Sequence, residues 1–241
     1  MVTLKMAIIF LMEQIRTPFS LIWTIMSPTV LFFFLHFNEI ELHYGDTAWL
    51  GKQISWFVGY ISFSVVLFNY CLYLVGRRES GFIATFVHNM DGRLLFIRSQ
   101  LIASLIMSIL YVFFFILVVL TAFQASPDYQ IVMIILKSIY INAFMMVSLT
   151  FMASFRVTFQ TASTIYSVLI TVCMVSEIVS LKYNEGIVYW INQVNPISIY
   201  STILHSDQEL SLMTIFLYSI MLIISIISAL TFKTEPVWSS Q

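Results

Sequence analysis

The chain has 241 residues, of which 60% are hydrophobic and only 10% are charged, with a net charge of −1 at pH 7. A soluble domain of this size cannot cover so much apolar surface, so the composition of the chain excludes a soluble globular protein. We expect an integral membrane protein without catalytic machinery of its own.

Residues 1–16 repeat apolar side chains at helical spacing, at Leu4, Ile8, Leu11 and Ile15, with polar side chains elsewhere around the helix. This pattern predicts an interfacial helix on the inner leaflet. A secretory signal is the competing interpretation. Against it, the segment has no small-residue cleavage site, and charged residues follow its apolar stretch.

Six apolar runs follow, each long enough for a helix that crosses a hydrocarbon layer of about 30 Å, which takes roughly 20 residues. They cover residues 18–37, 53–76, 97–123, 130–153, 159–180 and 210–232. Lipid offers no partner to open backbone groups, and apolar runs of this length without alternation indicate helices. We therefore predict an all-α integral membrane fold, with six transmembrane helices in a single domain over residues 1–241.

The basic residues predict the orientation, because positive charge is retained on the cytoplasmic side. Eight of the 11 lie in the segments predicted to be inside, namely Lys5, Arg16, Arg77, Arg78, Arg93, Arg98, Arg156 and Lys233. The segments predicted to be outside hold only Lys52 and Lys182. Both ends of the chain are thus expected in the cytoplasm.

The longest charged stretch, residues 76–100, lies between the second and third spans and reads GRRESGFIATFVHNMDGRLLFIRSQ. Its charged cluster, glycine, apolar-faced turn and basic helix start resemble the first coupling loop of type-2 ATP-binding-cassette exporter permeases. The residues that match that pattern are Arg78, Glu79 and Gly81. Arg77 replaces the usual acid, and Met90 stands where proline is commoner.

A second resemblance lies before the last span, in VNPISIYSTIL from residue 194 to 204. Asn195, Pro196 and Tyr200 resemble the family's Asn-Pro and aromatic segment outside the fifth helix. The surrounding outer segment, residues 182–207, is apolar and aromatic for a loop in water, which indicates that it re-enters the membrane surface. By the resemblance, it is an outer gate.

The resemblance implies a half-transporter in the cytoplasmic membrane of a bacterium. It would pair with a second permease copy, identical or related, and dock separate ATPase subunits that bind ATP and Mg, so that this chain holds no cofactor. No nucleic-acid partner is expected. Hydrophobic or amphipathic cargo is implied, such as a peptide toxin of the phenol-soluble modulin kind, a bacteriocin or a drug.

The expected ATPase contacts lie in the coupling loop, residues 77–93, and in one further inner turn. They are Arg77, Arg78, Glu79, Gly81, Phe82, Ile83, Phe86 and Arg156. Gly81 would allow close backbone approach, and the apolar side chains would act as anchors. The alternative is an inner loop whose arginines only fix topology and touch lipid phosphates.

Polar residues inside the predicted spans are few, and each costs free energy unless it faces a partner or water. Lys137 and Glu177 lie at similar depth in the outer half, so they could pair or line an outward cavity, or else snorkel to the interface. The fifth span also carries a hydroxyl stripe, Thr161, Thr164, Ser167 and Thr171. Helix packing is the expected role of the stripe, with cargo contact as the alternative.

No pattern of residues predicts a catalytic or metal site. Cys71 and Cys173 both fall inside spans and are expected to be packing residues.

Two other functions remain open. An autonomous secondary transporter would need helices broken by glycine or proline and an internal repeat, whereas only 7 Gly and 5 Pro occur. A non-transporting membrane assembly or immunity protein is the third candidate.

Overall fold

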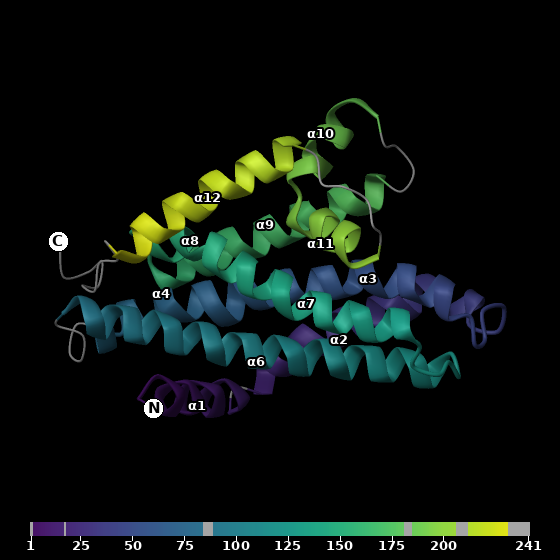
Figure 1. Ribbon diagram of the computed structural model, residues 1–241, viewed down its shortest axis with the longest axis horizontal. Helices are drawn as coiled ribbons and strands as arrows, with labels where there is room; N and C mark the ends of the chain where they lie inside the picture. Colours follow the sequence, from purple (N-terminus) through teal and green to yellow (C-terminus); the bar gives the residue numbers. More distant parts are fainter. Residues whose placement is uncertain (1, 17, 84–88, 181–184, 206–211, 231–241) are drawn as a thin grey trace.

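The computed structural model describes residues 2–16, 18–83, 89–180, 185–205 and 212–230 (Figure 1). Every regular element in these ranges is helical, which confirms the all-α prediction for the part of the chain described. The elements are α1 (Val2–Ile15), α2 (Pro18–His36), η1 (Phe37–Glu39), α3 (Thr47–Ser64), the π-helix η2 (Val65–Leu72), α4 (Tyr73–Glu79), α6 (Met90–Ala122), α7 (Tyr129–Ser148), α8 (Thr150–Ser154), α9 (Phe159–Ser180), α10 (Gly186–Val194), α11 (Pro196–His205) and α12 (Leu212–Leu230).

Four helices are long and apolar enough to cross a membrane, as expected of a membrane protein. They are Thr47–Glu79, Met90–Ala122, Tyr129–Ser154 and Phe159–Ser180, and they correspond to the second to fifth predicted spans. The first predicted span corresponds to α2, of 19 residues. Within the sixth predicted span, the apolar helix Ile215–Leu230 is shorter than each of the four long helices. The number of six spans therefore stays a prediction.

The helix formed by α3, η2 and α4 runs through the centre of the bundle, and 83% of its apolar window is buried, which fits apolar side chains on most of its sides. Eight of its 33 residues, Val65–Leu72, form a π-helix, in which backbone carbonyls lose their usual α-helical partners. The carbonyl of Asn69 instead accepts side-chain hydrogen bonds from Gln100 at 2.7 Å, Ser104 at 3.0 Å and Gln14 at 3.4 Å. Elements α1, η2 and α6 thus meet at one buried oxygen.

Helix α1 lies against the first half of α6 (Figure 1). The Ser99 hydroxyl donates to the carbonyl of Thr3 at 3.2 Å, and the rings of Phe10 and Phe96 lie 5.4 Å apart. These two contacts join α1 to the first three turns of α6. The interfacial position of this helix stays a prediction.

The two ends of the bundle bring together different loops. At one end, Arg93 donates to the carbonyl of Leu230, which joins the beginning of α6 to the end of α12. At the other end, the backbone N–H of Gly45 donates to the carbonyl of Phe123 at 3.1 Å. Asp46 caps α3 there, and the N–H of Trp49 that donates to its carboxylate lowers the pKa of Asp46 below its ordinary value.

Helix α11 packs deep against α3 through a glycine. A Cβ atom at Gly59 would lie 2.9 Å from the Cβ of Tyr200 and 3.0 Å from the carbonyl oxygen of Ile197. The Tyr200 hydroxyl then donates to Asn142 in the middle of α7 at 2.7 Å, and Asn142 donates to Ser108 of α6 at 2.6 Å. Helix α11 therefore reaches the interior of the bundle.

We expect Gly59→Ala to lower the free energy of unfolding by about 1–3 kcal/mol, because the added methyl group forces α3 and α11 apart. The melting temperature in detergent measures the change. Gly51→Ala is the matched control in the same helix, since its Cβ would lie 3.6 Å from the nearest side-chain atom, an ordinary contact. An equal loss in both variants would contradict the close approach at Gly59.

Candidate coupling face, outer segment and cavity

Arg77 connects α1, α4 and the start of the loop after α4. Its guanidinium forms an ion pair with Glu13 and donates to the hydroxyl of Tyr73 at 2.9 Å. That hydroxyl in turn donates to Glu13 at 2.5 Å, and the guanidinium lies 4.7 Å from the centre of the Phe82 ring. The Arg77 side chain is partly exposed, so it remains accessible to a partner.

Arg78, the next residue, has a different environment, because only 1% of it is exposed. Its guanidinium donates to the carbonyls of Ala153 at 3.0 Å and Val157 at 2.9 Å, and its Nε lies 3.6 Å from the Glu79 carboxylate. It thereby binds the end of α4 to the turn between α8 and α9. A direct ATPase contact by Arg78 stays a prediction, whereas its observed partners lie within the chain.

The turn that Arg78 holds includes Arg156, so two of the predicted contact regions are adjacent. Gly81 follows α4 with a φ of +73°, the left-handed conformation that ends many helices. Nothing lies within 4 Å of the position that its Cβ would take, so this chain leaves room for a larger side chain there. Glycine is favoured at this position by the backbone conformation and not by lack of space. Ile83 is buried, and Phe86 lies outside the described residues.

Lys137 and Glu177 form no ion pair in the part of the chain that the structure describes. Glu177 is buried on α9, and its carboxylate lies 3.5 Å from the amide nitrogen of Asn195. Neither Lys137 nor Glu177 borders the cavity described below. The alternative, that the two residues line an outward cavity of their own, stays a prediction.

The hydroxyl stripe of α9 lies on an exposed face of this helix. Thr164, Ser167 and Thr171 each donate to the carbonyl four residues earlier in their own helix, and Thr161 bonds the hydroxyl of Thr158. These hydrogen bonds stay within α9 and its cap, and they leave a face of small and apolar side chains. Neither packing against a further helix nor cargo contact is tested by these bonds.

Asn195 holds the outer segment to α9. Its amide donates to the carbonyl of Cys173 at 2.8 Å and to the hydroxyl of Ser176 at 3.1 Å. Its side-chain oxygen accepts the N–H of Ile197 at 3.0 Å and so caps α11, in which Pro196 is the first residue. The three predicted gate residues therefore lie at one buried junction, with Tyr200 one turn further along α11.

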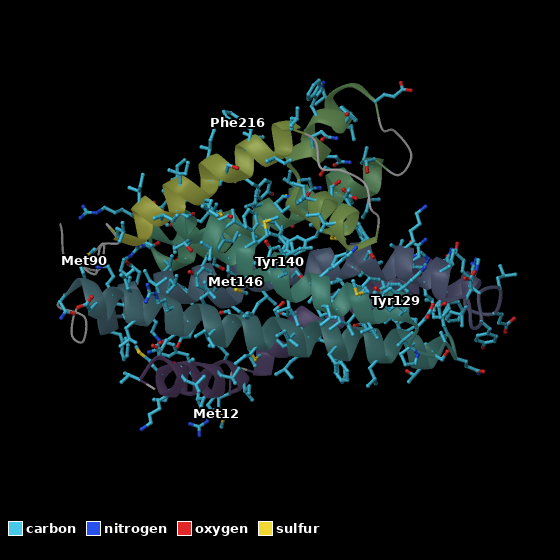
Figure 2. The ribbon with its side chains drawn as sticks, viewed as in Figure 1. Met12, Met90, Tyr129, Tyr140, Met146 and Phe216 are labelled. Carbon is cyan, nitrogen blue, oxygen red and sulfur yellow. The ribbon has the colours of Figure 1, made fainter. Side chains whose placement is uncertain are left out.

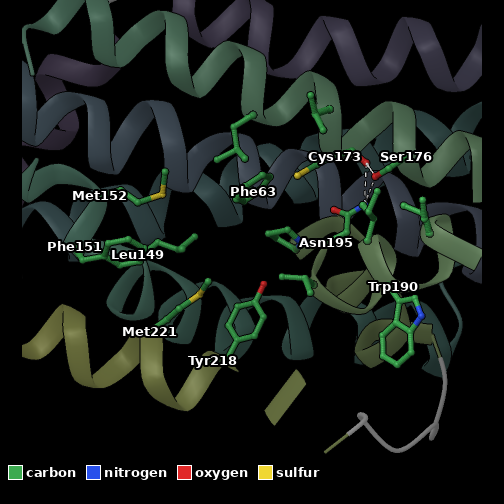
Figure 3. A pocket seen from close by; sticks show the side chains of 16 residues that line it. Phe63, Leu149, Phe151, Met152, Cys173, Ser176, Trp190, Asn195, Tyr218 and Met221 are labelled. Carbon is green, nitrogen blue, oxygen red and sulfur yellow. Dashed lines mark hydrogen bonds between the residues drawn. The ribbon is translucent and has the colours of Figure 1, made fainter. Parts of the chain in front are cut away.

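A cavity of about 580 Å³, which the sequence did not reveal, lies between α8, α9, α10 and α12 (Figure 3). Its walls are almost entirely apolar. The lining includes Phe63, Leu169, Cys173, Trp190, Tyr218 and Met221. No amphipathic pattern could have indicated it, because lipid-facing and cavity-facing side chains are equally apolar.

Side chains throughout the bundle interior are mainly apolar, and sulfur atoms are scattered among them (Figure 2). Cys71 and Cys173 are both buried and free, in keeping with packing roles. Among the residues described, no three His, Cys, Asp or Glu side chains gather in a group that could hold a metal ion.

No protein-family model matches the chain. Over 241 residues it is 98% identical to the protein of Escherichia coli named McbE, and the alignment covers 100% of both chains.

Proposed function

This chain belongs to the family of protein McbE, and we propose that it is the membrane subunit of an ATP-driven exporter of hydrophobic or amphipathic cargo. A peptide toxin or bacteriocin is the cargo class that we favour. The chain would cross the cytoplasmic membrane of a bacterium six times, with both ends in the cytoplasm. It would contribute no catalytic group and bind no cofactor, since ATP and Mg would be held by separate ATPase subunits.

The observation that carries the proposal is the connection of the coupling loop to the body of the bundle. A loop can transmit movement of a partner only if it is firmly attached to the helices that must move. Arg77 attaches its start to α1, and the buried Arg78 attaches it to the turn before α9. A force on residues 81–83 would therefore reach α1, α4 and α9 together. An inner loop that only fixes topology has no need of a buried arginine, because burying its charge is costly.

A second copy of the permease would pack on the exposed face of α9. Val168 and Val175 are each more than half exposed there, beside hydroxyl side chains that bond their own helix. Small side chains allow two helix backbones to approach closely in lipid, where association depends on packing rather than on removal of water. Symmetric pairing of one face is the commonest arrangement of identical chains.

The proposal is tested by purifying the chain in mild detergent from its native membranes and assaying the ATPase activity that comes with it. We expect activity with the native chain and its loss with Gly81→Trp, which places a large side chain in the partner contact. Gly45→Trp is the matched control, because Gly45 has a φ of +74° and equally open surroundings at the other end of the bundle.

Loss of activity in both variants would assign the effect to backbone strain rather than to the contact. No ATPase in any native preparation would overturn the exporter proposal. It would favour an autonomous transporter, in which the interrupted helix pair α10 and α11 would be the element to examine.

A further inference from the structure

The cavity of about 580 Å³ has a buried inner wall and an open outer wall. Phe63, Leu149 and Tyr218 on the inner wall are 5% exposed or less. On the outer wall, Val172 of α9 and Trp190 of α10 are 55% and 59% exposed. The cavity therefore opens sideways, between the outward faces of two helices, at a level where lipid would surround a chain that crosses the membrane as proposed above.

The polar groups that border the cavity are almost all engaged with one another. The amide of Asn195 donates to Cys173 and Ser176, and the Ser176 hydroxyl donates to the carbonyl of Cys173 at 2.9 Å. The hydroxyl of Tyr218 differs, because it has no hydrogen-bond partner among the described residues although only 5% of this residue is exposed. It points into the cavity (Figure 3). The hydroxyl is open to the cavity while the rest of the residue is covered, so a molecule bound in the cavity would supply its hydrogen-bond partner.

We propose that one acyl chain of a membrane phospholipid occupies this cavity, with the Tyr218 hydroxyl donating to the ester carbonyl of that chain. The volume lies within the range of about 300–1,000 Å³ that is typical of small-molecule sites. The inference rests on the membrane position in the proposed function, but it depends on neither export nor an ATPase.

Other occupants fit the chemistry of the cavity less well. Water needs about two to four polar partners, whereas the cavity offers one free hydroxyl. A peptide segment carries an N–H and a carbonyl at each residue, and nearly all of them would be left without partners in an apolar cavity. An acyl chain has a single acceptor, at its ester, followed by groups that need no hydrogen bond.

The first test uses phosphatidylethanolamine with a diazirine in the middle of one acyl chain. The purified chain is reconstituted in vesicles of phosphatidylethanolamine and phosphatidylglycerol, irradiated and mapped by mass spectrometry. We expect more adducts on the lining residues Met152 and Met221 than on Met26, which is 55% exposed on α2. Adducts in proportion to outward exposure alone would overturn the proposal.

Two residues one turn apart on α9 supply a matched pair of variants. Leu169 lines the cavity, whereas Ile165 does not and is 47% exposed. We expect Leu169→Trp to reduce the labelling of Met152 and Met221 by at least about fivefold, and Ile165→Trp to leave it unchanged. Equal labelling in the two variants would contradict an occupied cavity, and so would labelling of these methionines by a diazirine-bearing amphipathic peptide in place of lipid.

Tyr218→Phe keeps the shape of the cavity and removes only the hydroxyl, so it provides a second test if Leu169→Trp does not fold. Unlabelled diester and diether phospholipids compete with the photoreactive lipid. In the native chain we expect the diester to compete about fivefold better, the effect of one hydrogen bond, and in Tyr218→Phe we expect the two to be equal. Equal competition in the native chain would refute the ester contact. Because this assay contains no ATPase, its outcome is independent of the test of export.

Discussion

Arg78→Met is expected to lower the free energy of unfolding by about 3–5 kcal/mol. The substitution removes the donors to the carbonyls of Ala153 and Val157 and one charged neighbour of the Glu79 carboxylate, which is only 13% exposed. Hydrogen bonds from a charged donor are worth about 1.5–3 kcal/mol each, and a buried acceptor without a donor adds its own desolvation cost. The end of α4 and the turn before α9 should then separate.

The measurement is thermal unfolding in detergent, in which a loss of this size lowers the melting temperature by roughly 10 °C for a chain of this length. Arg77→Met is the matched control one residue away. Its guanidinium is partly exposed, so we expect a loss of less than about 1 kcal/mol.

Arg78→Lys separates charge from geometry, because a single ammonium group cannot reproduce the two-pronged contact to both carbonyls. It should recover less than half of the loss. Equal melting temperatures for Arg78→Met and Arg77→Met would show that the buried contact does not hold the two loops together.

The positions of the long helices could be predicted from hydropathy, but their ends could not. The second predicted span covered residues 53–76, whereas the helix runs over Thr47–Glu79. It begins earlier because the Asp46 side chain accepts the N–H of Trp49 and so caps it. In the same way, Asn89 accepts the N–H of Gly92, and α6 begins seven residues before its predicted span. Hydropathy detects the part of a helix that lies in lipid, whereas caps decide where it begins.

The candidate site was only partly predictable, because hydrogen bonds between distant residues leave no trace in local sequence. The charge of Arg78 was recognised, but its partners lie 75 and 79 residues away. For Lys137 and Glu177, counting residues gave the depth of each side chain and not its direction around the helix. Their pairing therefore could not be decided from the sequence.

The buried contacts at Asn69 were not predicted either. Gln14, Gln100 and Ser104 converge there because η2 is a π-helix, and its sequence, VVLFNYCL, has no feature that distinguishes it from an α-helix. Polar residues in an apolar helix are therefore informative even without a motif. The side chains of Gln14, Gln100 and Ser104 each donate to a carbonyl that lies far away in the sequence.

Asn195→Leu is expected to release the outer segment from α9, with a loss of about 2–3 kcal/mol. The side chain is 3% exposed and combines three donor contacts to α9, one of them at 3.5 Å, with the cap of α11. Polar contacts between helices in membrane proteins are worth about 0.6–1.7 kcal/mol each, and a helix cap about 1 kcal/mol. Amide hydrogen exchange should accelerate over residues 186–205 while the exchange of α6 stays unchanged.

Asn192→Leu is the control that gives this prediction its force, because the same substitution is made three residues earlier on the same segment. Asn192 is also buried, at 9% exposure, yet its side-chain oxygen has no hydrogen-bond partner among the residues described. Replacing a buried polar group that lacks a partner removes a desolvation cost, so we expect no loss of stability or a small gain. If the two leucine variants exchange alike, the segment is held by apolar packing, and Asn195 is not the residue that holds the proposed gate.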